Sequence, residues 1–102
     1  QTGLMWIGWI AFDLLLGDVH SLKEKRRILR PLIADLSRRT EAAAAEVGAH
    51  DLHRRAEIGV AVVAGEASRV RDLLDRAERA VADDHPEITL LSTRRGLHSS
   101  AD

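Results

Sequence analysis

The sequence of 102 residues contains no cysteine. This absence excludes disulfides, thiolate metal sites and thiol nucleophiles, and it fits a reducing compartment, so we expect a cytoplasmic protein. No apolar run approaches the ~18 residues of a membrane-spanning helix, because Asp13 interrupts the run from Met5 to Leu16. No basic region precedes that run and no small-residue cleavage site follows it. Neither a membrane span nor a signal peptide is therefore expected.

The length predicts a single domain, which we expect to cover residues 5–98. Residues 1–4 precede the only methionine and are expected to be an expression remnant, and residues 99–102 a flexible tail. The net charge of −1 hides an asymmetry, since residues 19–40 hold seven Lys or Arg against two acids, whereas residues 66–87 hold four Arg against seven acids. One basic and one acidic element are expected.

Apolar periodicity predicts strands over residues 5–16, 55–64 and 87–93 and a helix over 65–82. Another helix is expected from Ser21 to near Arg39, because Ser21 and Glu24 have the capping-box spacing that marks a helix start. In the first strand, the large apolar residues at even positions are expected on the covered face of the sheet, namely Ile10, Phe12, Leu14 and Leu16.

Residues 41–48 are ambiguous. Their alanines and glutamates favour a helix by propensity, but a first helix continued to Val47 would leave the sheet with too few strands. With a strand in this place, the order is βαββαβ. That order predicts an α+β, ferredoxin-like fold with a four-stranded antiparallel sheet and two helices on one face.

Three motifs resemble the YlxP family of small bacterial proteins of unknown function. They are the runs at residues 21–27 (SLKEKRR), 45–48 (AEVG) and 51–63 (DL followed by RAEIGVAVV). The resemblance extends from Met5 to about Leu97. It implies a ferredoxin-like fold with residues 41–48 as the second strand, and a gene that is often found beside those for ribosome-binding factor A and translation initiation factor 2. It implies no established activity.

Four cations of the first helix recur at positions i, i+3, i+4 and i+7, and we call this set the basic stripe: Lys23, Arg26, Arg27 and Arg30. Cations near a helix N-terminus oppose the helix dipole at a cost of roughly 0.3 to 1 kcal/mol each. A phosphate-binding surface would explain that placement, while a solvated helix face is the plainer alternative. Lys25 is also basic but lies off the stripe.

The face of the sheet opposite the helices is expected to be flat and apolar, with Trp9, Ala61, Gly8 and other small residues on it. Such a face suits a homodimer or a partner protein. Asp13, Glu46 and Glu57 are expected on the same face, with Glu46 directly opposite Glu57 if the connection is a symmetric hairpin. Salt bridges to nearby arginines are the expected neutralising contacts, and a metal or an acid–base pair is the less common solution.

Several activities find no support. Acylphosphatases share this strand order but need an asparagine, which the chain lacks, and a phosphate-loop arginine, which residues 17–20 lack. An RNA-recognition module of the stacking type needs aromatic residues, and residues 55–64 contain none. His50 and His53 in one loop are a weak metal signal. We therefore expect no enzymatic activity, no metal and no cofactor.

These observations lead to two functional hypotheses. In the first, the protein is an RNA- or ribosome-associated factor in ribosome maturation or translation, and binds ribosomal RNA or ribosomal particles through the basic stripe. In the second, it is a protein-interaction or homodimerisation module that uses the open sheet face, with Trp9, Asp13, Glu46, Glu57 and Ala61 as its surface residues.

Overall fold

The order of the elements in the computed structural model, which describes residues 3–102, is the predicted βαββαβ. The elements are β1 (Trp6–Leu16), α1 (Leu22–Thr40), β2 (Ala43–Gly48), β3 (Arg55–Ala64), α2 (Ala67–Asp84) and β4 (Ile88–Ser99). Of the expected expression remnant over residues 1–4, residues 1 and 2 lie outside the described part of the chain.

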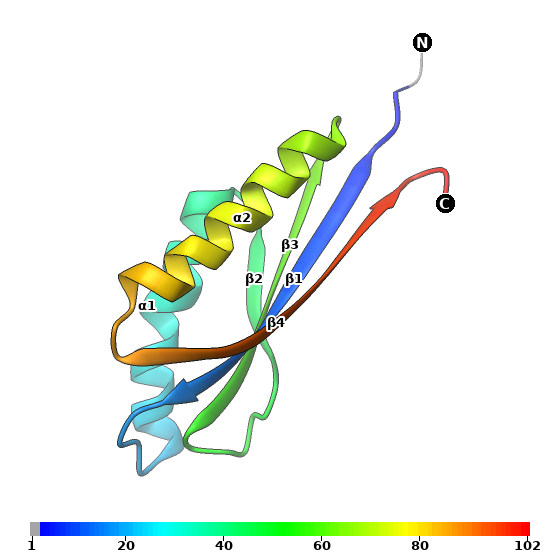
Figure 1. Ribbon diagram of the computed structural model, residues 1–102. Coiled ribbons are helices and arrows are strands. Elements are labelled where there is room, and N and C mark those ends of the chain that lie inside the picture. The colour runs from blue at the N-terminus through cyan, green and yellow to red at the C-terminus, as the bar shows by residue number, and fades with distance from the viewer. Residues whose placement is uncertain (1–2) are drawn as a thin grey trace.

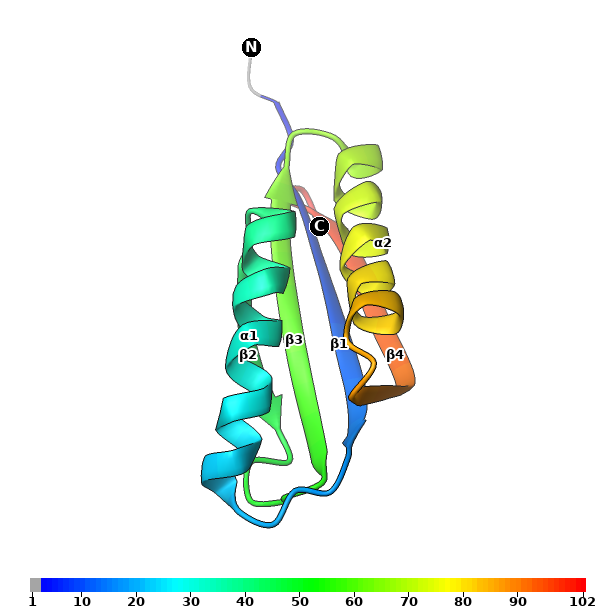
Figure 2. The ribbon, with the colours of Figure 1, turned by 90° about the vertical axis from the view of Figure 1, so that its left-hand side faces the viewer.

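The four strands form one sheet in the order β2-β3-β1-β4, with antiparallel pairing throughout. Both helices lie side by side over one face of this sheet (Figure 2). The start of β1 and the end of β4 lie at the same end of the sheet, where Trp6 pairs with Ser99 (Figure 1). The ferredoxin-like α+β fold is therefore confirmed, with β1 as a central strand.

The hydrophobic core lies between the sheet and the two helices. Ile10, Phe12, Leu14 and Leu16 of β1 are at most 1% exposed, as their even spacing predicts. The apolar stripes of α1 and α2 cover them, because residues at helical spacing present one face to the sheet. The opposite face of the sheet, which we call the open face, carries the odd-numbered residues of β1.

Gly8 does not lie on the open face, so that prediction was wrong. A Cβ atom on Gly8 would collide with the side chain of Val70 and would lie 3.1 Å from Leu74, both on α2. Gly8 has the same parity as the buried residues of β1, and its missing side chain lets α2 approach the strand closely.

Glu41, whose backbone is in the left-handed conformation, ends the first helix, so that residues 43–48 form a strand. Ser21 caps the start of α1, since its hydroxyl accepts a hydrogen bond from the Glu24 amide at 3.1 Å. The helix then runs through Pro31 to Thr40, where Glu41 adopts φ 54° and its amide bonds to the Ser37 carbonyl. This turn ends the helix and allows β2 to pair with β3.

The last strand is longer than predicted. Its expected end was Thr93, but β4 continues to Ser99 and pairs with the whole of β1. β4 lies at the edge of the sheet and pairs only with β1. An edge strand tolerates polar residues, so the polar segment after Thr93 did not indicate a strand. Beyond it, the Ser100 amide donates to the Met5 carbonyl at 2.7 Å.

Candidate functional site

The basic stripe forms one continuous surface on α1. The side chains of Lys23, Arg26, Arg27 and Arg30 are all exposed, and together with Pro31 they line a hollow of about 530 Å³. The stripe extends about 10 Å along the helix axis, since seven residues rise 1.5 Å each. Among residues 3–102, no acidic side chain forms an ion pair with any of the four.

The capping box positions the stripe. The Glu24 carboxylate accepts a hydrogen bond from the His20 amide at 3.2 Å, and the Ser21 hydroxyl satisfies the amide of Glu24. These contacts fix the first turn of α1, so Lys23 and Arg26 project from a rigid helix start.

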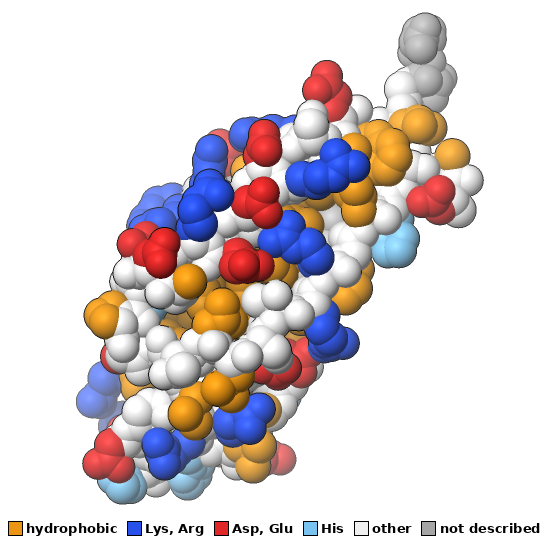
Figure 3. All heavy atoms as spheres, viewed as in Figure 1, with side chains coloured by type: hydrophobic (Ala, Val, Ile, Leu, Met, Phe, Trp, Pro, Cys, Tyr) orange, Lys and Arg blue, Asp and Glu red, His pale blue; other side chains and the backbone are white. Residues whose placement is uncertain are grey.

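Other cations contrast with this set. Along α2, acidic and basic side chains are intermixed (Figure 3). Arg95, next to α2, pairs with Asp75 at 2.9 Å and Glu78 at 3.1 Å. Arg94 lies on the open face, and the Arg54 guanidinium donates to the Gly17 carbonyl at 3.0 Å.

Lys25 is not a surface cation, because only 2% of its side chain is exposed. Its ammonium donates to the Ala49 carbonyl at 2.7 Å and to the His50 carbonyl at 3.4 Å, and it lies 2.9 Å from Glu46 Oε2. The contact between the ammonium and Glu46 Oε2 does not have the geometry of a hydrogen bond, so the two groups form an ion pair. The sequence did carry the signal, since Lys25 precedes Leu29 by four residues on the buried stripe of α1.

Glu46 does not lie on the open face opposite Glu57, so that prediction was wrong. The register shifts after Glu46, so that Glu46 pairs with Ile58 and Gly48 pairs with Glu57. Ile58 is fully buried beneath the helices, and Glu46, as its neighbour, points to the same side. The hairpin is asymmetric because of this irregularity, which the spacing of the residues does not reveal.

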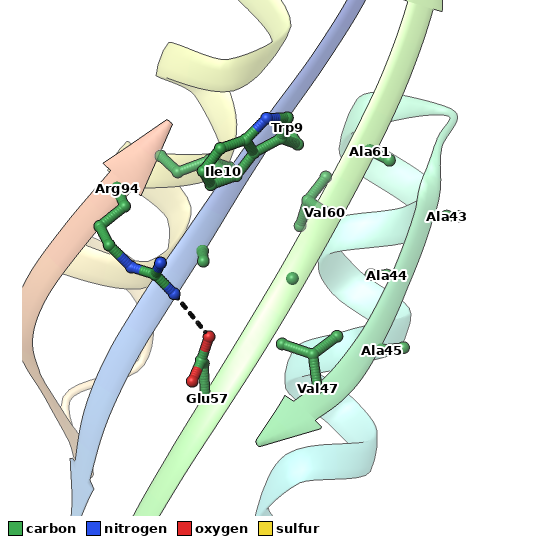
Figure 4. Close-up of a pocket in the computed structure, with 12 residues that line it drawn as sticks. Trp9, Ile10, Ala43, Ala44, Ala45, Val47, Glu57, Val60, Ala61 and Arg94 are labelled. Carbon is green, nitrogen blue, oxygen red and sulfur yellow. Dashed lines mark hydrogen bonds and ion pairs between the residues drawn. The ribbon is translucent and has the colours of Figure 1, made fainter. Parts of the chain in front are cut away.

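The open face contains an apolar groove of about 410 Å³. Trp9 and Ala61 line it as predicted, together with residues of the edge strand β2 such as Ala45 and Val47 (Figure 4). Gly96 makes room for Trp9, since a Cβ atom there would collide with the indole ring. The groove therefore depends on small residues beside a large one.

Two carboxylates do meet on the open face, but they are Asp13 and Glu57, which are cross-strand neighbours. Arg94 pairs with Glu57 at 2.8 Å, and the Ser92 hydroxyl donates to Asp13 at 3.0 Å. The predicted salt bridge to a nearby arginine is confirmed for Glu57. Like charges on neighbouring strands are thereby offset within the chain.

A second polar network, which the sequence did not indicate, joins the end of α1 to the turn before β4. Asp35 is nearly buried, and its carboxylate accepts hydrogen bonds from Arg38 at 2.6 Å and Arg39 at 2.9 Å. His85 Nε2 lies 3.0 Å from the other carboxylate oxygen. Burial raises the pKa of Asp35, but the hydrogen bonds from His85 and Arg39 and the charges of Arg39 and Arg38 together hold it below the ordinary 3.8.

No three of the His, Asp and Glu side chains within residues 3–102 come together as a metal site would require. In the same range, no helix has the length and hydropathy needed to cross a membrane.

Comparisons with known proteins place the chain beside one family. Residues 7–95 match the family model described as a protein of unknown function, DUF503. The uncharacterized protein YlxP of Bacillus subtilis is 30% identical over 88 residues, which cover 86% of this chain and 95% of YlxP.

Among similar solved structures, the first supports the fold alone. The de novo designed protein Foldit4 superposes with a TM-score of 0.53 at 12% identity, covering 90% of this chain and 96% of Foldit4. SnoaB, a cofactor-independent oxygenase from Streptomyces nogalater, gives a TM-score of 0.46 at 11% identity, covering 95% of this chain and 94% of SnoaB. At these identities neither similarity says anything about activity.

Proposed function

The chain belongs to the YlxP family, described as DUF503, whose function is unknown, and we propose that it binds the phosphate backbone of folded RNA through the basic stripe on α1. In this proposal it acts in the cytoplasm as a non-enzymatic factor in ribosome maturation or translation, and its ligand is ribosomal RNA or a ribosomal particle. The gene neighbourhood that the family resemblance implies supports the choice of RNA.

The observation that carries the proposal is the hollow lined by the four stripe cations and Pro31. Charges of one sign that share a concave surface raise the local potential and attract phosphate groups. Lys23 also lies in the first turn of α1, where the helix dipole disfavours a cation, so a bound anion would relieve that repulsion. The α2 arginines Arg69, Arg71 and Arg79, which form no ion pair within residues 3–102, lie on a helix where acidic and basic side chains are intermixed, and the acids weaken their field.

The ligand is proposed to be folded RNA because the stripe contains no aromatic side chain on which a base could stack. Proteins that bind single strands without sequence preference use such aromatics, whereas double-stranded regions are recognised by shape and phosphate contacts. Trp9 lies on the open face, on the other side of the sheet from α1.

The test compares two triple variants with the same change in net charge. One variant replaces Arg26, Arg27 and Arg30 with glutamine, and the control replaces the exposed α2 residues Arg69, Arg71 and Arg79 with glutamine. Binding to purified ribosomal particles is measured by co-sedimentation, and binding to a structured ribosomal RNA fragment by titration over a salt series.

We expect the wild type to lose affinity with salt at a slope near −3 in log–log form, since each phosphate contact contributes about −0.7 to −0.9. In the stripe variant the slope should become less negative by about 2, and co-sedimentation should be abolished. The α2 control should behave as the wild type. Equal losses in both variants, or no loss in the stripe variant, would contradict the proposal.

A further inference from the structure

The open face is apolar where a sheet with one covered face is usually polar. In antiparallel sheets with helices on one side, residues pointing away from the helices are typically solvated and polar. Here β2 presents Ala43, Ala45 and Val47 on that side, and β3 presents Ala61 and Val63. The pattern is that of a face covered by another surface.

The exposure of individual side chains supports this conclusion. Val63 is 63% exposed and Val47 52% exposed, and both are β-branched residues in regular strands. Between Val47 and Trp9 lies the groove of about 410 Å³, open along the sheet surface (Figure 4). The exposed valines of a second copy can enter this groove, in the way that side chains of the two inner faces of a β-sandwich interdigitate.

The charges on the open face cancel one another. Asp13 and Glu57 supply two negative charges, and Arg94 and Arg55 supply two positive ones on the same side of the sheet. Two copies can therefore approach through this face without net repulsion. The α1 surface would repel a second copy, because its stripe carries four cations that form no ion pair in the described part of the chain.

The area is sufficient for a stable pair. Four strands about 4.8 Å apart, with 11, 6, 10 and 12 residues that each rise about 3.3 Å, give a face of roughly 600 Å². Two such faces bury roughly 1,200 Å² in total, which is the lower end of the range for specific interfaces. Small side chains at the centre let the two sheets approach to the usual spacing of about 10 Å.

We propose that the open face binds the open face of a second copy of this chain, so that the protein is a homodimer of two stacked sheets. The helices then form the two outer layers. Dimerisation uses no residue of the basic stripe, so the dimer is expected to form without bound RNA.

The test measures the mass of the full chain in solution by light scattering over a concentration series. The substitution Ala61→Glu places a charge at the centre of the apolar face, and Ala82→Glu places the same charge on the exposed surface of α2. We expect a dimer for the wild type and for Ala82→Glu. For Ala61→Glu we expect a folded monomer by circular dichroism, with association weakened at least tenfold.

A second measurement keeps the test decisive if Ala61→Glu fails to fold. The chain has no native cysteine, so a single cysteine can carry a spin label at a chosen site. Labels attached through Ala61→Cys should be closer to each other in the dimer than labels attached through Ala82→Cys. A wild-type monomer at every concentration, or shorter distances for the α2 label, would overturn the proposal.

Discussion

The Lys25 ammonium lies 2.9 Å from Glu46 Oε2, beneath the surface that carries the basic stripe. This pair joins the first turns of α1 to the end of β2. The same ammonium donates to the carbonyl of Ala49, a residue held at φ 56°, where side chains other than glycine are uncommon. The contact therefore fixes the loop between β2 and β3 as well as the helix.

Replacement of Lys25 by methionine should destabilise the protein by about 3 kcal/mol, because it leaves the carboxylate of Glu46 largely buried without a counter-charge. The carbonyl of Ala49 would also lose its donor. Urea denaturation would measure the change as a lower midpoint with an unchanged slope.

Two further variants separate charge from packing. In the double variant Lys25→Met with Glu46→Met, part of the lost stability should return, since no unpaired charge remains. Lys23→Met, on the exposed stripe, should change stability by no more than about 0.5 kcal/mol. A loss for Lys23→Met as large as that for Lys25→Met would contradict the assignment of Lys25 to the interior.

Asp35 should make stability depend on pH in the acidic range. Its folded pKa lies below the ordinary 3.8, because its contacts with His85, Arg39 and Arg38 outweigh the effect of burial. A lowered folded pKa gives stability that is present above the unfolded pKa and is lost as the pH falls through the folded pKa. Asp35→Asn should therefore unfold several degrees below the wild type above about pH 5.

The difference between Asp35→Asn and the wild type should shrink as the pH falls below 3.8, and thermal unfolding followed by circular dichroism at several pH values would show it. Asp75→Asn is a suitable control, since Asp75 forms an exposed ion pair with Arg95. Such surface pairs contribute little. A difference for Asp35→Asn that stays constant with pH would rule out the charged network as its cause.

Gly96 should tolerate no side chain while Trp9 keeps its position. A Cβ atom at Gly96 would lie 2.7 Å from Trp9 Cε2 and still closer to Nε1, so Gly96→Ala must displace the indole. We expect a cost of about 1 to 3 kcal/mol, as for other overpacked sites. In a Trp6→Phe background, Trp9 is the only tryptophan, and its emission should shift.

Gly65→Ala serves as the matched control for Gly96→Ala, because a Cβ atom at Gly65 would have no heavy atom within 4 Å apart from those of its chain neighbours. Its stability should equal or slightly exceed that of the wild type, since alanine restricts the unfolded chain. If Gly65→Ala lost as much stability as Gly96→Ala, contact with Trp9 would not be the reason.

The two proposed surfaces together predict bivalent RNA binding. Stacking through the open faces leaves both basic stripes on the outer layers, so one dimer can hold two RNA segments. Ala61→Glu should then weaken binding to a long structured RNA by about tenfold or more, because the second contact is lost. Its affinity for a short duplex that covers a single stripe should be unchanged, and filter binding with both RNAs measures the contrast.

The outcomes for bivalent binding also distinguish the proposals from one another. A weaker affinity of Ala61→Glu for the short duplex would place Ala61 near the RNA itself. Equal binding of both RNAs by the wild type and Ala61→Glu, with the dimer lost, would mean that each stripe acts alone.

Much of the fold is encoded locally in the sequence. The alternation of large residues at Ile10, Phe12 and Leu14 determined which face of β1 is buried, because a strand has a period of two. Ser21 and Glu24 fixed the start of α1, since a cap acts within a single turn. The spacing of the basic stripe likewise determined that its four side chains would share one surface.

Tertiary structure decided the features that depend on pairing between distant segments. Residues 43–48 form a strand although their alanines favour a helix, because the edge of β3 offers backbone partners that a longer helix would leave unpaired. The register shift after Glu46 turned its carboxylate from the open face toward Lys25. A strand's side chains change face with a single residue of register, so the position of this charge was decided only when β2 paired with β3.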